Sequence, residues 1–233
     1  MRGVAVDPED DLDLVIAGAA HEFGNLLAVI SNYATLAARR VEDPATQELL
    51  EHVGVASARA VDLARQLHYL SGPRVMEREP VFVQAVVRDA VAELTAELGT
   101  ECTLELDLPD EPLDVLASVP SIELVLLQLT RNARQAMPEG GAVTIAARRR
   151  SGTSGTTDVE ISVSDTGVGM SAEVRAHALE PLFTTRPKGK GCGLGLAIVD
   201  RTMRRLGGDV GIESVEGSGT IVRLGLEGTT ADG

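Results

Sequence analysis

A histidine beside a carboxylate is the first group in this sequence suited to nucleophilic chemistry. His21 is followed by Glu22, and Asn25 lies one helical turn further on, over the same face of a helix. Free imidazole titrates at roughly pH 6.5, so an exposed ring keeps a nucleophilic nitrogen at neutral pH. An adjacent carboxylate can orient the ring or take its proton. By itself the pattern is weak, because a lone exposed histidine is more often an ordinary solvated side chain.

Two amides form the second candidate group. Gln128 and Asn132 are four residues apart on a predicted helix from Ser118 to Met137, so both project from one face. Amide oxygens suit a hard cation such as Mg²⁺, and amide nitrogens suit phosphate oxygens. The competing interpretation is two ordinary polar positions on a half-exposed helix.

A carboxylate followed by glycines forms the third group. Asp165 ends a predicted strand, and Gly167 and Gly169 follow it. A carboxylate placed there can accept a hydrogen bond from an exocyclic amine while the glycine backbone approaches the ring closely. Such a pattern is also common in ordinary turns.

The fourth group is the glycine-rich segment from Gly189 to Leu196, which runs into a predicted helix. Successive glycines expose backbone N–H groups, and a helix N-terminus favours anions. Lys188 and Lys190, the only lysines of the chain, lie here with Arg186. The spacing differs from a dinucleotide fingerprint and from a Walker A loop. A flexible glycine loop is the alternative, but the lysines favour phosphate contact.

Two heptad helices are expected to carry the first group. The first apolar series is Leu12, Ile16, Ala19, Phe23, Leu26, Ile30, Tyr33 and Ala37, and the second is Leu49, Val53, Ala56, Ala60, Leu63, Leu67 and Leu70. Pro44 is placed to open the second helix. One antiparallel hairpin would expose much of its seam, so we predict pairing into a dimeric four-helix bundle. His21, midway between Ala19 and Phe23, should point outward.

The remaining chain predicts an α/β sandwich around one mixed sheet, which makes the whole fold class α+β. Expected strands are 80–83, 103–108, 113–117, 142–148, 159–164, 209–214 and 220–226, and expected helices are 84–98, 118–137 (with Ser118 as cap) and 195–206. The expected domains are residues 1–73, a dimerisation and phosphotransfer hairpin, and 74–233, an ATP-binding domain.

Bulk properties narrow the function classes. The formal net charge of −14 argues against nucleic acid or an anionic membrane surface as a partner. Neither a signal peptide nor an apolar run long enough to span a bilayer is recognisable. Two isolated cysteines suggest a reducing compartment. We therefore expect a cytoplasmic protein.

In order, these segments resemble the bacterial sensor histidine kinases. AHEFGNLLAVISNY (20–33) resembles the phosphoacceptor box, LVLLQLTRNARQAMPEGG (124–141) the asparagine box, and VSDTGVGM (163–170) the first glycine box. EPLFTTRPKGKGCGLGLAIV (180–199) resembles the lid with the second glycine box, and GSGTIVRL (217–224) the closing strand. The resemblance covers nearly the whole chain.

The resemblance implies an ATP-dependent protein histidine kinase. His21 would accept the phosphoryl group, Glu22 would assist that transfer, and Asn25 would position a water for dephosphorylating a response regulator. Asn132, with Gln128, would bind Mg²⁺, and Asp165 and Thr220 would lie at the adenine. The implied ATP contacts also include Gly167, Gly169, Thr184, Thr185, Arg186, Lys188, Lys190, Gly191, Gly193, Leu194 and Gly195. Implied partners are a response regulator, a second copy of the chain and a separate or missing sensor.

Two positions depart from the family pattern. Gln128 replaces the usual first asparagine of its box, which changes the reach of the amide. Gly24 replaces an asparagine of the acceptor box, and a mid-helix glycine costs about 1 kcal/mol of helix stability. An ATP-independent phosphotransfer or docking scaffold with a degenerate ATP site is the alternative. A serine kinase of the same ATP fold, acting on an anti-sigma-type partner, ranks third because the phosphoacceptor hairpin would then have no purpose.

Overall fold

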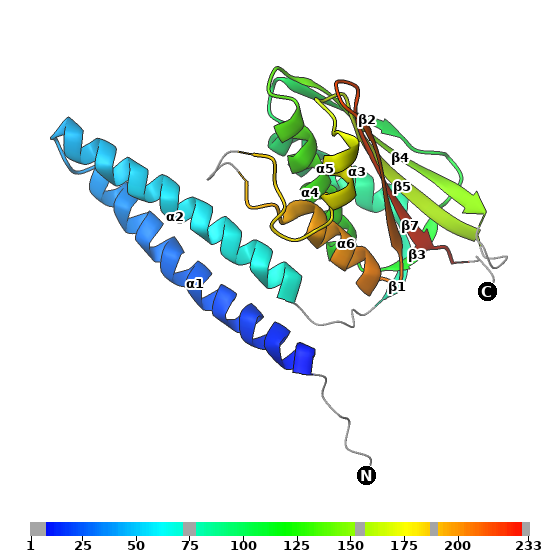
Figure 1. The fold of residues 1–233 in the computed structure, drawn as a ribbon, viewed down its shortest axis with the longest axis horizontal. Helices are drawn as coiled ribbons and strands as arrows, with labels where there is room; N and C mark the ends of the chain where they lie inside the picture. Colours follow the sequence, from blue (N-terminus) through cyan, green and yellow to red (C-terminus); the bar gives the residue numbers. More distant parts are fainter. Residues whose placement is uncertain (1–7, 72–77, 152–156, 187–190, 230–233) are drawn as a thin grey trace, which may run out of the picture. The chain divides into compact units, whose positions relative to one another are not determined.

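The chain forms two compact units in a computed structural model that describes residues 8–71, 78–151, 157–186 and 191–229. Unit 1 comprises Met1–Arg74 and unit 2 comprises Val75–Gly233. Figure 1 shows the elements of both units.

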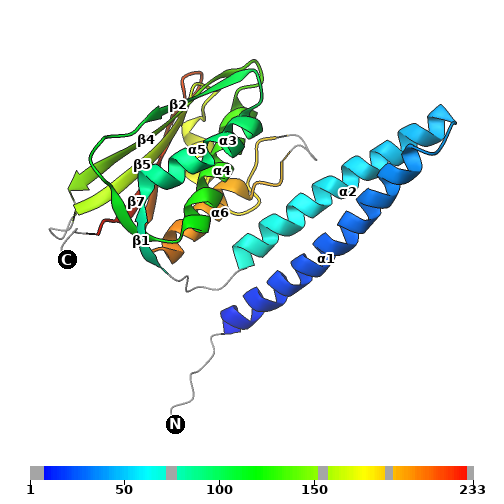
Figure 2. The same ribbon diagram turned by 180° about the vertical axis from the view of Figure 1, so that it is seen from behind.

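Unit 1 is a hairpin of two long antiparallel helices. Helix α1 spans Pro8–Ala38 and helix α2 spans Pro44–Ser71, and the two lie side by side in both views (Figures 1 and 2). Pro44 opens α2, as predicted from its position. Asp43 accepts a hydrogen bond from the Thr46 N–H at 3.0 Å. This contact and a second one from the Thr46 hydroxyl lower the pKa of Asp43, which is typical of a residue that caps a helix.

The heptad seam predicted from the sequence is not the seam that joins the two helices. The buried apolar residues of α1 are Ala17, Ala20, Ala34 and Ala38, and the buried residues of α2 are Ser57, Ala64 and Ser71. A β-carbon on Gly24 would lie 3.6 Å from that of Ala64, so the helices approach closely along small residues. The predicted core residues Phe23 and Tyr33 are instead 62% and 70% exposed. The residues of the predicted heptad seam therefore lie largely outside the contact between the two helices of one hairpin, and their burial against a second hairpin in a four-helix bundle stays a prediction.

Unit 2 is a layered α/β structure with eleven elements in its described residues. In chain order they are β1 (Glu79–Phe82), α3 (Val83–Leu98), β2 (Cys102–Asp107), β3 (Asp114–Ala117), α4 (Val119–Ala136), β4 (Gly141–Ser151), β5 (Thr157–Asp165), α5 (Ala172–His177), α6 (Gly195–Arg205), β6 (Asp209–Val215) and β7 (Gly219–Glu227). The predicted strands and helices agree with these bounds to within a few residues. Only the short helix α5 was not predicted.

The strands form two sheets rather than the single sheet predicted. The main sheet has the order β2-β4-β5-β7-β6, with β2 and β4 parallel and the other pairs antiparallel. The mixed character was therefore predicted correctly. Strands β1 and β3 form a separate antiparallel pair, and Val115 of β3 makes one further antiparallel bridge to Gly228, just after β7. Each of these strands is four residues long, so the sequence pattern could not show with which partner it pairs.

The main sheet has an apolar face and a charged face because side chains alternate along each strand. The apolar face packs under helices α3, α4 and α6, which lie on the same side of it (Figures 1 and 2). Val143, Ile161 and Leu224 are among its buried residues.

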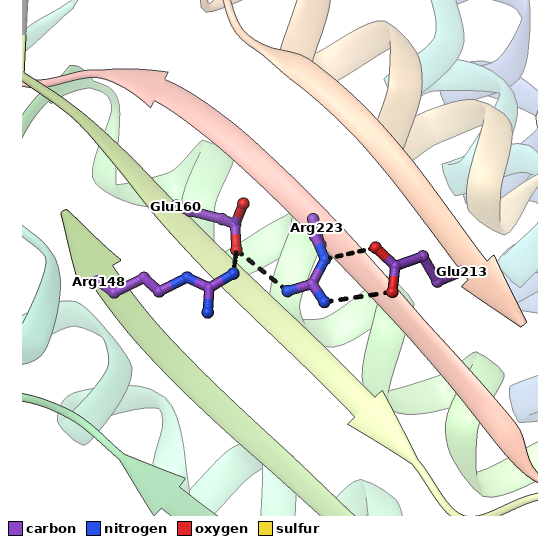
Figure 3. Close-up of polar contacts among 4 residues, drawn as sticks. All are labelled: Arg148, Glu160, Glu213 and Arg223. Atoms are coloured by element: carbon purple, nitrogen blue, oxygen red, sulfur yellow. Dashed lines mark hydrogen bonds and ion pairs between the residues drawn. The ribbon is translucent and has the colours of Figure 1, made fainter. Parts of the chain in front are cut away.

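The other face carries a network of ion pairs across four strands (Figure 3). Glu160 on β5 accepts hydrogen bonds from Arg148 at 2.6 Å and from Arg223 at 3.1 Å. Arg223 also holds Glu213 of β6 through two nitrogens, at 3.0 and 3.3 Å. The network joins β4, β5, β7 and β6.

The start of α4 differs from the predicted cap. Ser118 occupies the N-cap position of α4, but its side chain makes no capping hydrogen bond within the described chain. The Ser118 carbonyl accepts the N–H groups of Ser121 and Ile122 instead. Of the helices that the structure describes, none combines the length and apolar character required to cross a bilayer.

Candidate functional site

Three of the candidate residues lie on α1 of the hairpin. His21, Glu22 and Asn25 are all exposed, in agreement with the outward direction predicted for His21. In the single hairpin Ala19 and Phe23 are also exposed, and Ala17 and Ala20 are the buried residues on either side of Ala19.

The ring of His21 lies beside a second imidazole that sequence reasoning did not single out. The ring centroids of His21 and His68 are 6.4 Å apart, with an angle of 49° between the planes. His68 comes from α2, and its Nδ1 is 3.3 Å from the carbonyl oxygen of Ala17. The phosphoacceptor candidate therefore has a titratable neighbour across the hairpin.

Asp165 lies at the end of β5, where the chain leaves the main sheet. Its carboxylate accepts the N–H of Gly167 at 2.9 Å. Partial burial raises the pKa of Asp165, while hydrogen bonds from the N–H groups of Gly167 and Thr220 act to lower it. With its backbone donors already in place, the carboxylate can accept a further hydrogen bond from a ligand amine.

Two hydroxyls beside Asp165 connect the first glycine box to the closing strands. Thr220 is paired with Asp165 in the register of β5 and β7. Its hydroxyl is 2.9 Å from that of Ser214, which also accepts the Met170 N–H at 2.8 Å. Ser214 was not predicted as a site residue. Its contribution arises from cross-strand contacts, which no local motif reveals.

The glycines of this region are required by close backbone contacts. Gly169 has a φ of +64°, and a β-carbon there would lie 2.0 Å from the carbonyl oxygen of Val215. A β-carbon on Gly167 would lie 2.7 Å from the carbonyl oxygen of Ala136, at the end of α4. Any side chain at either position would displace the turn that holds Asp165.

Helix α4 brings Asn132 to the start of α6. A β-carbon on Gly195 would lie 3.0 Å from Oδ1 and 3.1 Å from Nδ2 of Asn132. The Nδ2 atom is buried and has no hydrogen-bond partner among the residues that the structure describes. Gln128, one turn earlier, is only 4% exposed. Of the two predicted amides, Asn132 is the one adjacent to a helix N-terminus.

The segment before α6 is folded back on itself through Gly193. Gly193 has a φ of +68°, and its carbonyl accepts a hydrogen bond from the Leu182 N–H at 2.9 Å. These features place the second glycine box against residues 182–183. Leu194 is buried, and its side chain does not cap α6 within the described residues, so the first N–H groups of α6 remain available to an anion.

The lid candidates lie in the same segment. Thr184 and Thr185 are exposed, and the Thr184 hydroxyl accepts the Arg186 N–H at 3.2 Å. Partial burial lowers the pKa of Arg186, and the Cys192 side chain acts to raise it. A β-carbon on Gly191 would lie 3.1 Å from the Arg186 side chain. Lys188 and Lys190 lie outside the described residues.

Helix α4 thus links the two groups of candidate residues: Asn132 lies against Gly195 of α6, and Ala136, one turn later, lies against Gly167 next to Asp165. Residues 118–230 match the family model described as "Histidine kinase-, DNA gyrase B-, and HSP90-like ATPase". This match spans α4 to β7 and includes all the candidate residues of unit 2.

Longer matches extend over the hairpin as well. The chain is 32% identical over 221 residues to the sensor kinase CckA of Brucella abortus, which covers 90% of this chain and 23% of that protein. It is 33% identical over 225 residues to the C4-dicarboxylate transport sensor protein DctB of Pseudomonas aeruginosa, covering 92% of this chain and 36% of that one. The chain thus spans about a quarter to a third of these two relatives.

A solved structure, full-length ShkA in complex with AMPPNP, has the same fold. It superposes with a TM-score of 0.74 at 24% identity, covering 94% of this chain and 46% of that one. Unit 2 is thus an ATP-binding domain of the histidine kinase, gyrase and chaperone type. With the hairpin in front of it, the chain belongs to the sensor histidine kinases and comprises their catalytic core.

Proposed function

We propose that the chain is an ATP-dependent protein histidine kinase that phosphorylates its own His21 and passes the phosphoryl group to an aspartate of a response regulator. The observation that carries the proposal is the buried Nδ2 of Asn132, which has no hydrogen-bond partner among the described residues and lies beside the start of α6, where those residues supply no side-chain cap. A buried amide without a partner costs free energy, and an anionic ligand at that position would satisfy it.

The residues of unit 2 fit a nucleoside triphosphate. Asp165 offers a carboxylate to an exocyclic amine, and Thr220 lies beside it with its hydroxyl held by Ser214. Gly167 and Gly169 let the backbone approach a flat base. We assign Thr184, Thr185, Arg186, Lys188, Lys190, Gly191, Gly193, Leu194 and Gly195 to the phosphates.

Asn132 is the residue that we assign to Mg²⁺, because an amide offers both an oxygen for the cation and a nitrogen for phosphate. Bound Mg²⁺ would neutralise charge on the phosphates. Gln128 lies one turn earlier on α4, and we assign it a supporting contact from that buried position.

The chemistry at His21 needs an exposed ring and a nearby base. A ring nitrogen of His21 attacks the γ-phosphorus, an N–P bond forms, the bond to the ADP oxygen breaks, and Glu22 takes the imidazole proton. Catalysis of this kind depends mostly on positioning and charge stabilisation. The phosphoryl group then moves from His21 to the regulator aspartate, and Asn25 orients a water for the reverse regulation, dephosphorylation of that aspartate.

Dimerisation through the hairpin is part of the proposal. The exposed apolar residues of unit 1 include Phe23, Leu26, Ile30, Tyr33, Leu49, Val53 and Leu63. A second hairpin would cover this surface and form a four-helix bundle. We place the protein in the cytoplasm, because the free cysteines Cys102 and Cys192 suit a reducing compartment.

The burial of Gln128 favours, to a lesser degree, the scaffold alternative, since a buried amide is less available to a metal. One labelling experiment decides between the two. Incubation with γ-labelled ATP should label the chain, and acid should release the label, as expected for phosphohistidine. His21→Ala should abolish labelling, while His52→Ala on the exposed face of α2 should not. Labelling that survives in His21→Ala would refute the assignment, and a chain that binds no ATP would favour the scaffold.

A further inference from the structure

A second histidine is built into the hairpin beside His21. His68 is exposed and lies at the edge of the face of α2 that packs against α1, four residues after Ala64 and three before Ser71, both of which are buried. Its neighbours on this face are small residues, so the imidazole is much larger than the hairpin contact needs. The position invites a chemical explanation.

The hydrogen bonding of His68 defines which nitrogen carries the proton. Nδ1 is 3.3 Å from the Ala17 carbonyl oxygen, and a carbonyl only accepts. Nδ1 must therefore donate, which leaves Nε2 of the neutral ring with a free lone pair. Ala17 lies one helical turn before His21, so the anchor holds the ring next to the phosphoacceptor candidate.

The distance suits an interaction with a group attached to His21 rather than with its bare ring. The ring centroids are 6.4 Å apart. A phosphoryl group on His21 would add an N–P and a P–O bond to the reach of that ring and would carry negative charge on its oxygens.

We infer that His68 is a positioning residue for phosphorylated His21: its Nε2 takes up a proton and pairs with the phosphoryl oxygens, which stabilises the phosphorylated state. The inference rests on His21 being the phosphoacceptor, as proposed above. The two equilibria are linked. Phosphorylation of His21 favours protonation of His68, and protonation of His68 favours phosphorylation of His21 by the same factor.

Other charged groups surround the pair and belong to its electrostatics. On α1 the neighbour of His21 is the carboxylate of Glu22. On α2, Arg65 lies one turn before His68, and Tyr69 is in ring contact with it at 6.2 Å between centroids. Arg65 keeps its charge at all relevant pH values, so its contribution to the pair does not change with pH.

The first test is a pH titration of the imidazoles by NMR in the full chain, before and after phosphorylation with phosphoramidate, a reagent that needs no ATP. Mass spectrometry identifies the chains that carry phosphate on His21 alone. Coulomb's law for a doubly charged group at a separation like the 6.4 Å between the rings, screened as in water, predicts roughly tenfold higher proton affinity for His68. His52 should titrate unchanged. An unchanged or lower proton affinity of His68 would overturn the inference.

The second test separates chemistry from packing. The amide of His68→Asn can still donate to the Ala17 carbonyl, but it has nothing to titrate near neutral pH. The titration of His21 itself is common to both proteins, so the wild type is compared with His68→Asn at each pH and at fixed ATP and ADP concentrations. The ratio of phosphorylated to free His21 in the wild type, divided by the same ratio in His68→Asn, should rise several-fold as the pH falls below about 6.5. His52→Asn should behave as the wild type. A purely structural role predicts that His68→Asn matches the wild type, which would refute the proposal.

The two proposals fail in different ways. Phosphoramidate-treated chain with a shifted His68, in a protein that ATP does not label, would refute the kinase assignment and support the histidine pair. ATP labelling at His21 with an unshifted His68 would do the reverse.

Discussion

The two units of this chain bury their apolar residues in opposite ways. In the ATP-binding unit the large apolar residues face inward, and Leu94, Leu126 and Ile198 are almost fully buried. In the hairpin the small residues face inward, and Phe23, Ile30 and Tyr33 lie on the surface. The ATP-binding unit has a core of its own, whereas the hairpin has a narrow contact between its two helices and an exposed apolar face.

The two units therefore obtain their stability from different contacts. A packed core supplies stability within one chain, and Ala- and Gly-lined helices gain little from burial because they bury little apolar area. The hairpin would gain most of its stabilisation by covering Phe23 and its neighbours.

The largest effect is expected from charges on the exposed face of the hairpin. Phe23→Glu with Ile30→Glu removes two large apolar side chains from each protomer of the proposed dimer. Each is worth about 1.5–3 kcal/mol when buried, so dimer affinity should fall roughly a thousandfold or more. Light scattering and sedimentation would measure it. Arg39→Glu with Arg40→Glu, just past the end of α1, is the matched control. A double variant that remains dimeric would show that this face is not the interface.

Next in size is a glycine substitution in the ATP-binding unit. Gly219 has a φ of +94°, and a β-carbon there would lie 2.0 Å from the Asp165 carbonyl oxygen. Gly219→Ala should destabilise unit 2 by about 3 kcal/mol and weaken nucleotide binding, because Asp165 must move. Gly217→Ala, also at positive φ but with open space around it, isolates the cost of the backbone conformation. Equal losses in the two variants would contradict the steric argument.

Removing the buried carboxylate of the outer sheet face should cost about 2 kcal/mol. Glu160→Gln keeps the shape but loses the charge that Arg148 and Arg223 contact (Figure 3). Thermal or denaturant unfolding of the full chain would show it in the transition of unit 2. Glu213→Gln, at the exposed end of the network, should change stability little. If both variants lose the same stability, burial does not account for the contribution of Glu160 to the stability of unit 2.

Nucleotide affinity should fall in acid. Burial raises the pKa of Asp165, and the ionised form is the one that accepts an amine hydrogen bond. Affinity should therefore drop as pH falls through that raised pKa, by up to about tenfold per pH unit below it. The contribution of Asp165 to the free energy of unfolding of the free protein should instead increase as the pH falls. A raised carboxyl pKa means that the folded state binds the proton more tightly than the unfolded state. Calorimetric measurement of nucleotide binding from neutral pH downward would test this. Asp165→Asn should bind the nucleotide weakly, with an affinity that does not change with pH.

The smallest effect should have the opposite sign. Gly24→Ala places a β-carbon 3.6 Å from that of Ala64, an ordinary contact, so it fits the seam. Helix propensity then predicts a gain of about 1 kcal/mol in hairpin stability. The same chemical change that damages unit 2 at Gly219 should stabilise unit 1 here. Loss of stability would show that the helices cannot accept even one methyl group.

The sequence predicts the elements well and their mutual contacts less well. Heptad spacing and Pro44 locate both helices of the hairpin, but not which face is inward, because Ala, Gly and Ser give no hydropathy signal. Helix α5 has only six residues, too few for a periodic pattern to emerge. Asp165 and Asn132 are recognisable from motifs, whereas Ser214 and His68 matter through partners far away in the chain. Contacts of that kind follow from the fold and not from local spacing.

The end of α4 has a consequence for how the ATP-binding unit responds to its ligand. The Ala136 carbonyl accepts the Val168 N–H at 3.0 Å and lies against Gly167, one residue from Thr166 and two from Asp165. Asn132 is one turn earlier on the same helix. A shift of α4 would therefore move the proposed phosphate contact and the proposed base contact together, so that one helix would couple the two ends of a bound nucleotide.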